Sequence, residues 1–270
     1  MKESFFEVSS STPILAVALH GGHQLHDEIK KIIGLSNNVL LHEEDPFTDY
    51  IASAFDSRII QNTSRFEYDI NRSPQSAVYK IPSDCWNLPI YPNQIKESIS
   101  DQSQQKYSVF YKQIDEILNN LLNKFSKIFI WDIHSFNNRG RPDINSINDN
   151  NSVPDICLGT SNSHSDFYPL FKEIAENLRT IDFFGKNLSV DFNNPFPGGY
   201  FARYLHHHFA ERVAVFSIEF NKRVFMQNTH FQFDETNGMI DIAAISRLRE
   251  MLLSQNQIIL NHLKLNDYLN

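Results

Sequence analysis

The chain has 270 residues, of which 41% are hydrophobic, and a formal net charge of −8. An acidic balance without a basic block argues against nucleic acid as a partner. An aromatic content of 13% is too apolar for a disordered chain. No apolar run approaches the roughly 20 residues of a membrane span, and the short run at 14–19 is not expected to be a signal peptide. We therefore expect a cytoplasmic protein without a membrane partner.

Histidine is abundant in this chain and cysteine is scarce. Eleven histidines stand against two cysteines, Cys85 and Cys157, whose spacing fits neither a metal motif nor a disulfide framework. Reduced thiols are then the default. Any metal ion would be held by imidazole and carboxylate groups, a ligand set that suits catalytic zinc rather than structural zinc.

Short apolar runs alternate with helical patterns along the chain. Strands are predicted at residues 14–20, 39–42, 65–70, 127–134, 155–159, 188–192 and 213–220. Helices are predicted at residues 47–60, 103–124, 166–179 and 240–263. Neither a repeat nor a Pro/Gly/Ser linker divides the sequence, so we expect one domain over residues 1–270. The alternation predicts an α/β fold with a mostly parallel or mixed sheet covered by helices on both faces.

Three polar side chains fall at the carboxyl ends of predicted strands, where such sheets bind ligands. His20 leaves its strand into a Gly-Gly turn, and His134 ends the most hydrophobic strand. Asp132 lies two residues earlier on the same face, where a carboxylate can fix the tautomer of a metal-ligating imidazole. The alternatives are solvated histidines in a turn and a core aspartate bonded to backbone. Glu219 ends an apolar strand, and near a metal-bound water it would be a natural general base.

A carboxylate from the segment EEDPFTDY could complete a site of two histidines and one carboxylate. Asp45 and Asp49 are four residues apart, so a helix beginning at Pro46 would bring them near one another. Asp45 is also suited to be the N-cap of that helix, which makes Asp49 the better candidate ligand. Glu43 and Glu44 are expected on the solvated surface.

The segment RFEYDINR carries groups suited to a substrate carboxylate. Arg72 beside Asn71 offers a planar guanidinium and an amide. The alternative is an Arg–Asp pair through Asp69 that only holds a loop. Further substrate-binding candidates lie in three segments. These are RFEYDINR itself, the Asn- and Asp-rich residues 136–154, and NNPFPGGYFARY, whose Gly-Gly amides could face an anion. The candidates are Arg65, Arg139, Arg141, Gly198, Gly199 and Tyr200.

In this order the motifs resemble those of the N-formylglutamate amidohydrolase family. The match comprises His20-Gly21-Gly22, DPFTDYIA, RFEYDINR, WDIHS, PDICLGT, NPFPGGY and IEFNKRVFM, from about residue 14 to 226. The D-I-N-R and D-I-H elements are also similar to motifs of aspartoacylase and succinylglutamate desuccinylase. The resemblance implies a three-layer α/β/α, phosphorylase/hydrolase-like fold and a zinc-dependent amidohydrolase that acts on small N-acyl amino acids.

Residue by residue, the resemblance implies that His20 and His134 are zinc ligands. Glu219 would act first as base and later as acid, while Asn71 and Arg72 would bind the substrate carboxylate. In the aspartoacylase branch the first ligand pair is H-x-x-E, and the fourth residue here is His23. The second ligand therefore stays open between His23 and Asp49.

Two rival interpretations remain. The same fold and metal could serve a different N-acyl amino acid, a peptide terminus or a cell-wall fragment, with residues 136–154 and 191–204 shaping the acyl and side-chain pockets. Alternatively, the chain could be a metal-free carboxylate-binding protein, an interpretation that His23 in place of glutamate favours.

Overall fold

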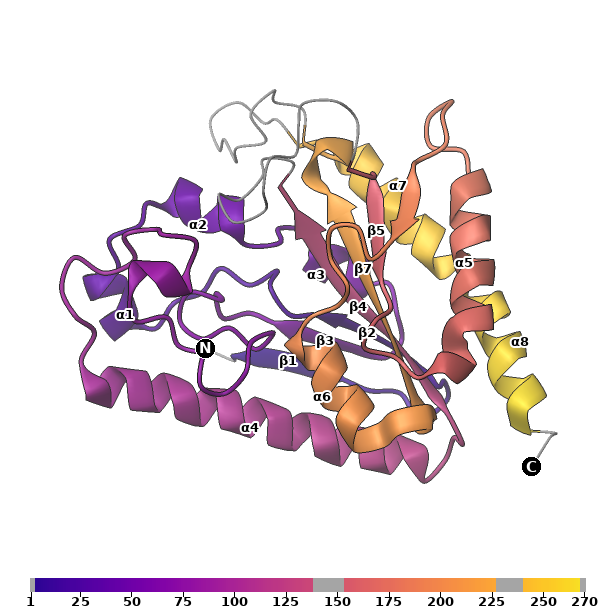
Figure 1. Ribbon diagram of the computed structural model, residues 1–270, viewed down its shortest axis with the longest axis horizontal. Helices are drawn as coiled ribbons and strands as arrows, with labels where there is room; N and C mark the ends of the chain where they lie inside the picture. Colours follow the sequence, from indigo (N-terminus) through magenta and orange to yellow (C-terminus); the bar gives the residue numbers. More distant parts are fainter. Residues whose placement is uncertain (1–2, 138–152, 227–239, 268–270) are drawn as a thin grey trace.

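A seven-stranded sheet forms the centre of the computed structural model, which describes residues 3–137, 153–226 and 240–267 (Figure 1). In spatial order β1-β3-β2-β4-β7-β5-β6, the strands are β1 (Ser4–Glu7), β3 (Arg58–Gln61), β2 (Ile14–Ala18), β4 (Ile128–Phe136), β7 (Val213–Asn221), β5 (Ile156–Gly159) and β6 (Val190–Phe192). The central strands β3, β2, β4 and β7 are parallel to one another. Strand β1 pairs antiparallel with β3, and β5 pairs antiparallel with β7 but parallel with β6.

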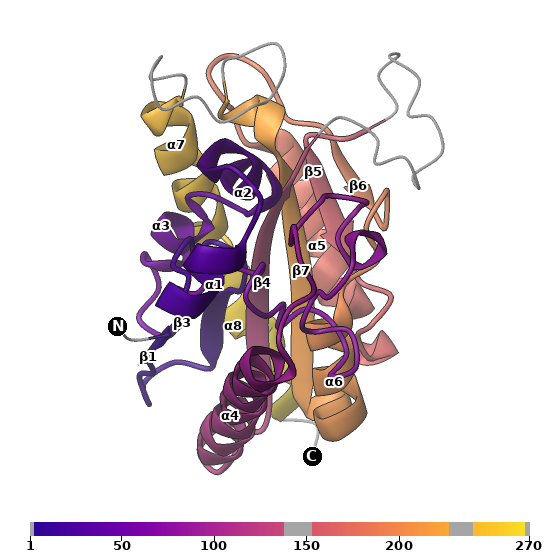
Figure 2. The same cartoon turned by 90° about the vertical axis from the view of Figure 1, so that its left-hand side faces the viewer.

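Helices cover both faces of this sheet (Figures 1 and 2). The helices are α1 (Asp27–Ile32), α2 (Asn37–Glu43), α3 (Thr48–Ala52), α4 (Glu97–Leu122), α5 (Tyr168–Thr180), α6 (Tyr200–Phe209), α7 (Ile242–Leu253) and α8 (Asn256–Asp267). One large hydrophobic core joins the sheet to α3, α5, α7 and α8, and a second large core joins it to α4 and α6. The predicted α/β/α class is confirmed, with a mixed sheet. Within the described residues, no helix is both long and apolar enough to cross a membrane.

Strand β4 sends alternate side chains into the two cores. Phe129, Trp131 and Ile133 belong to the core under α5 and α7, and Ile128 and Ile130 to the core under α4 and α6. Alternation continues beyond the second set, so Asp132 and His134 project from the same face as these isoleucines, nearer the carboxyl end. The buried strand β4 therefore presents two polar side chains near its carboxyl end, both on the face that packs under α4 and α6.

The apolar run at 39–42, predicted as a strand, lies in helix α2. A run of four residues cannot distinguish strand from helix by periodicity. The side chain of Ser36 caps this helix by accepting the amide of Val39 at 3.4 Å. The helix predicted at 47–60 is also wrong: α3 is short, and the chain turns into strand β3 at Arg58.

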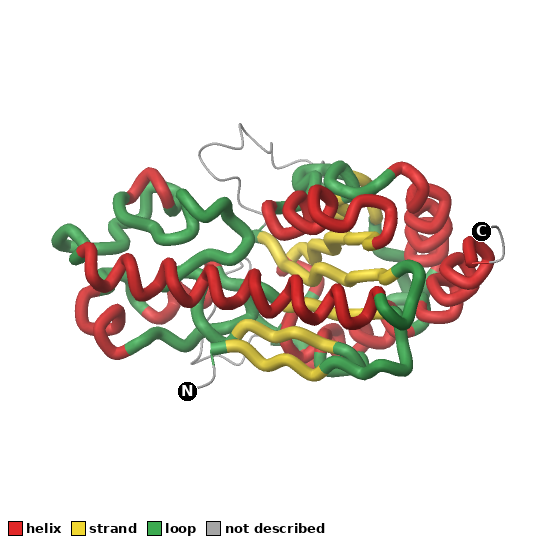
Figure 3. The backbone as a smooth tube through the Cα atoms, turned by 90° about the horizontal axis from the view of Figure 1, so that it is seen from below, coloured by secondary structure: helices red, strands yellow, loops and turns green. Residues whose placement is uncertain are grey.

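Residues 65–70 are buried but form turns instead of the predicted strand. Two tyrosines of α4 bond to this region: Tyr111 Oη donates to the carbonyl of Ile70 at 2.6 Å, and Tyr107 Oη to that of Arg72 at 2.9 Å. In Figure 3, α4 crosses the molecule in front of the strands. Buried backbone carbonyls need a hydrogen-bond donor. In a strand, a neighbouring strand would supply that donor, and here the tyrosine hydroxyls supply it.

The other predicted elements are close to those observed. Helix α4 begins at Glu97, a little before the predicted 103–124, and β6 begins two residues into the predicted 188–192. The helix predicted at 240–263 is divided in two, because the chain turns at Ser254 between α7 and α8.

Candidate metal centre and pocket

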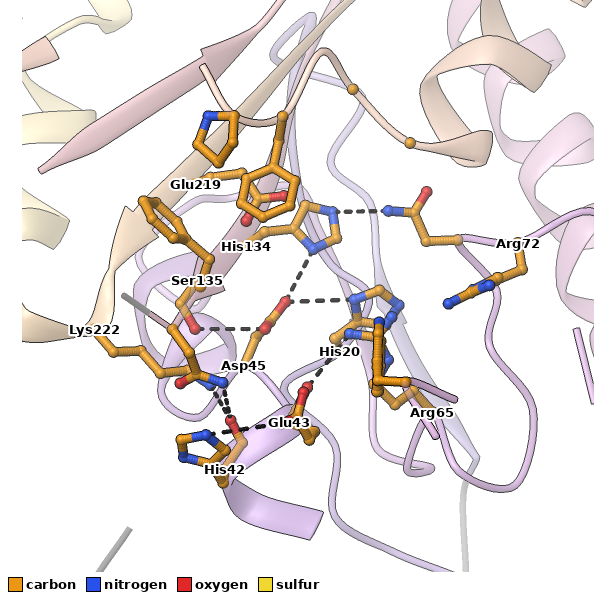
Figure 4. A pocket seen from close by; sticks show the side chains of 18 of the residues that line it. His20, His42, Glu43, Asp45, Arg65, Arg72, His134, Ser135, Glu219 and Lys222 are labelled. Carbon is orange, nitrogen blue, oxygen red and sulfur yellow. Dashed lines mark hydrogen bonds and ion pairs between the residues drawn. The ribbon is translucent and has the colours of Figure 1, made fainter. Parts of the chain in front are cut away.

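A pocket lies at the carboxyl ends of the parallel strands β2, β4 and β7 (Figure 4). Its lining includes His20 from the turn after β2, His134 from β4 and Glu219 from β7. In the pairing of β4 with β7, Glu219 is the partner of His134, so both side chains project from the same face. The sheet therefore brings together the three strand-end residues that the sequence singled out.

His20, His134 and Asp45 form a buried cluster. Asp45 Oδ2 lies 3.0 Å from His134 Nδ1 and 3.4 Å from His20 Nδ1, with the carboxylate between the two rings (Figure 4). One donor atom from each residue lies within 4.8 Å of the others, and in the described part of the chain this is the only such group of three or more His, Cys, Asp or Glu. Two imidazoles and a carboxylate suit a divalent transition metal, so the donor set fits zinc.

A second carboxylate holds the far side of each imidazole. His20 Nε2 lies 2.7 Å from Asp69 Oδ1, and His134 Nε2 lies 2.9 Å from Asp132 Oδ1. Asp132 in turn accepts the hydroxyl of Ser217 at 2.7 Å. Carboxylates in this position fix the tautomer and orientation of metal-binding histidines. Both Nδ1 atoms are thereby directed to the centre of the cluster, and Asp132 takes the position expected from strand alternation.

The carboxylates of Asp45 and Asp69 stay ionised although they are buried. Burial alone would raise the pKa of Asp45, but hydrogen bonds from His134 and His20 outweigh it and hold the pKa well below its usual range. For Asp69, burial is likewise opposed, by Arg65 and His20, which lower its pKa. Burial would lower the pKa of His134, but Asp132 and Asp45 raise it well above the usual value. The cluster therefore stabilises positive charge at its centre.

The carboxylate beside the two histidines is Asp45, in place of the candidates His23 and Asp49. His23 Nδ1 lies 2.6 Å from Glu44 Oε2, and its Nε2 lies 2.5 Å from Asn37 Oδ1. Asp49 lies in the first turn of α3, where burial raises its pKa. Neither joins His20 and His134 in the cluster.

Asp45 is not the N-cap of α3, contrary to the expectation from the sequence. The N-cap is Phe47, whose φ of 69° bends the chain into the helix. The carbonyl of Asp45 accepts the hydroxyl of Thr48 at 2.7 Å, and its amide donates to the carbonyl of His20 at 2.9 Å. The backbone of Asp45 therefore supports the turn, while its side chain is available to the pocket.

Arg65 and Arg72 differ in how far they are committed to Asp69. Arg65 is buried and donates to Asp69 Oδ2 from Nη2 at 2.6 Å and from Nε at 3.2 Å. Arg72 approaches the same oxygen only through Nε, at 3.7 Å, and a third of its side chain is exposed. The two guanidinium carbons lie 4.8 and 5.8 Å from the ring centre of Trp86. The loop-holding Arg–Asp pair is thus Arg65–Asp69, and Arg72 is the more accessible pocket arginine.

Asn71 is held by the start of helix α6. Its Oδ1 accepts the amide of Phe201 at 2.9 Å, its carbonyl accepts the amide of Tyr200 at 3.3 Å, and its Nδ2 lies 3.4 Å from His134 Nε2. A Cβ atom on Gly199 would lie 2.2 Å from Asn71 Oδ1. A side chain at position 199 would therefore displace the Asn71 side chain from this place. Arg139 and Arg141, the other predicted substrate-binding arginines, lie outside the described residues.

Two residues that the sequence interpretation overlooked or misplaced support the pocket. Lys222 is buried, and its Nζ donates to the carbonyls of His42 and Glu44, both at 2.6 Å; burial lowers the pKa of this amine to about 8. Glu44, expected on the surface, is 1% exposed and bonds to His23 and Ser64. For Lys222, the sequence offered one signal of burial: this lysine directly follows a buried strand.

Fold and pocket together define a class: a three-layer α/β/α protein with a candidate metal centre at the carboxyl edge of its parallel strands. The sequence matches the family model described as N-formylglutamate amidohydrolase over residues 12–226, and the chain belongs to this family. The resemblance inferred from the motifs is confirmed.

Solved structures share this fold. The crystal structure of N-formylglutamate amidohydrolase from Ralstonia eutropha JMP134 is 16% identical, with a TM-score of 0.77 over 98% of this chain and 100% of that one. A gene product from Agrobacterium tumefaciens is 19% identical, with a TM-score of 0.64 over 96% of each chain. A search of curated proteins found no significant match.

Proposed function

We propose that the protein is a zinc-dependent amidohydrolase that cleaves the amide of an N-formyl or other N-acyl amino acid, with N-formylglutamate as the reference substrate. The observation that carries this proposal is the cluster of His20, Asp45 and His134 in one pocket with Glu219 and Arg72. Membership of the N-formylglutamate amidohydrolase family supports a small-molecule substrate with an amide bond.

His20, Asp45 and His134 would hold the ion, through both Nδ1 atoms and the Asp45 carboxylate. A bound zinc ion would lower the pKa of a water molecule to roughly 7 and polarise the substrate carbonyl. Asp69 and Asp132 keep the two imidazoles in the required tautomer, because each accepts from the Nε2 side.

Glu219 is proposed as the general base and then the general acid. It would take a proton from water as the oxygen attacks the carbonyl carbon. As the C–N bond breaks, it would return that proton to the leaving nitrogen, and the products would be the acyl carboxylate and the free amino acid. Its position beside His134 in the β4–β7 pairing supports this role.

Arg72 is proposed to bind the substrate carboxylate, together with the side-chain amide of Asn71. A partly exposed guanidinium in the pocket is suited to two parallel hydrogen bonds with a carboxylate. Arg65, which Asp69 already holds, would help to stabilise charge that develops on the carbonyl oxygen.

The test combines metal analysis with a substrate screen on the full chain purified without chelator. We expect about one zinc per chain and hydrolysis of N-formylglutamate, compared with N-acetyl and N-succinyl amino acids and with an N-formyl amino-acid amide that lacks the carboxylate. Zinc binding without hydrolysis of any of these would favour a peptide or cell-wall substrate. A chain that binds no zinc even after its addition would instead be a metal-free carboxylate-binding protein.

A further inference from the structure

The segment that leads into Asp45 is held by buried cations of the pocket. Lys222 Nζ donates to the carbonyls of His42 and Glu44, each at 2.6 Å, and Arg65 Nη1 donates to the intervening carbonyl of Glu43 at 3.4 Å. Three successive carbonyls that end one residue before Asp45 are therefore bonded to positive side chains. The path of the chain into Asp45 is set by these contacts.

The end of helix α2 explains why a cation lies here. Helix α2 ends at Glu43, and the last carbonyls of a helix have no partner within it and carry partial negative charge. Lys222 follows β7, the strand that carries Glu219, and Asn137, which follows β4, also donates to the His42 carbonyl, at 2.8 Å. The two strands that contribute His134 and Glu219 thus also fix the end of α2.

A buried ammonium is costly unless it is hydrogen bonded. Lys222 is 1% exposed, and its Nζ donates to the backbone carbonyls on both sides of Glu43, those of His42 and Glu44. The His42 carbonyl belongs to the last turn of α2, and the Glu44 carbonyl to the residue that caps the helix. The second bond, to Glu44, reaches the peptide that joins Glu44 to Asp45.

We propose that Lys222 is a positioning residue that sets the metal ligand Asp45 by bridging the carbonyls of His42 and Glu44. This inference rests on the proposed function, because it assigns Asp45 to the zinc site. The bridge holds the Asp45 carboxylate at 3.0 and 3.4 Å from the two Nδ1 atoms. The competing role is direct contact of the amine with substrate, since Lys222 also lines the pocket.

The test measures zinc affinity on the full chain, by competition with a chromophoric chelator, and the visible spectrum of the cobalt-substituted protein. The variants are Lys222→Met, which removes both hydrogen bonds of Nζ, and Lys222→Arg, which keeps the charge and N–H donors. The matched control is Lys106→Met, because Lys106 also bridges two acceptors, Glu3 and Glu67, but lies outside the pocket. Circular dichroism and thermal unfolding establish that each variant is folded.

We expect Lys222→Met to weaken zinc binding about 10- to 100-fold, the range found for residues that orient metal ligands, and to alter the cobalt spectrum. Lys222→Arg should recover most of the affinity, and Lys106→Met should leave it unchanged. If Lys222→Met does not fold, Lys222→Gln carries the same comparison with a shorter amide donor.

Wild-type zinc affinity and an unchanged cobalt spectrum in folded Lys222→Met or Lys222→Gln would overturn the positioning role. A raised KM with unaltered affinity would overturn it in favour of direct substrate contact. A wild-type chain that binds neither zinc nor cobalt would overturn the proposed function itself, and this inference with it, so the two failures are distinguishable.

Discussion

Replacing Asp69 with asparagine would remove one charge from a fully buried junction. Asp69 Oδ2 accepts two bonds from Arg65 and one from Tyr79, while Oδ1 faces His20 Nε2 at 2.7 Å and accepts the amide of Asn71 at 2.9 Å. An asparagine keeps the shape but places an NH₂ group against donors, whichever way the amide is turned. Either Arg65 or the amide of Asn71 then loses its acceptor.

The expected loss of stability follows from the burial of this pair. Asp69 is 0% exposed and the Arg65 side chain 10%, and removing one partner of a buried ion pair costs about 3–5 kcal/mol. The matched control is Glu7→Gln, which breaks the exposed pair of Glu7 with Arg58 and should cost about 0–1 kcal/mol. The contrast isolates the effect of burial, because both changes remove one carboxylate charge opposite an arginine.

The assay is urea unfolding with a chelator present, so that metal binding does not contribute. We expect the free energy of unfolding of Asp69→Asn to fall by about 4 kcal/mol, and the double variant Arg65→Met/Asp69→Asn to recover part of this loss. Zinc affinity should also fall about 10- to 100-fold, because the group opposite His20 Nε2 loses its negative charge. A loss no larger than that of Glu7→Gln would refute the reasoning about the buried junction.

Three further outcomes are expected. Glu219→Gln should keep the zinc content and lower turnover at least about a hundredfold, the usual effect of losing an acid–base group; unchanged turnover would remove Glu219 from that role. Gly199→Ala should raise KM about tenfold in steady-state assays, because a Cβ 2.2 Å from Asn71 Oδ1 displaces that side chain, and a wild-type KM would contradict this. Burial raises the pKa of Cys85 to about 11 and of Cys157 to about 12, so both should resist a thiol reagent at pH 8 until urea is added; rapid labelling of the folded chain would count against their burial.

The local sequence pattern was sufficient to predict side-chain positions where these depend on a single strand. In β4, the alternation that buries Ile130 and Trp131 on opposite faces also places Asp132 beside His134, and the pairing at 2.9 Å follows from that strand alone. The helical pattern at 103–124 likewise predicted a helix, and α4 covers most of this range. The motifs were sufficient to identify the family. Each motif is short and weak alone, but their order along the chain is specific.

Patterns failed where distant segments decide the structure. Residues 65–70 form turns because tyrosines of α4 satisfy nearby carbonyls, and this contact joins positions about 40 residues apart. Likewise, the side chain of Glu44 is buried because His23 and Ser64 approach it from other segments. Neither partner is visible in the local sequence.

The sequence by itself determined the chemical groups of the pocket: two imidazoles and a glutamate at strand ends, and an arginine beside an asparagine. Only the tertiary structure decided that Asp45 joins the histidines, that Asp69 holds both His20 and Arg65, and that Lys222 supports the segment before Asp45. The physical reason is that side-chain direction within a strand repeats every two residues, whereas Asp45 and His134 are 89 residues apart and meet only through the packing of the whole sheet.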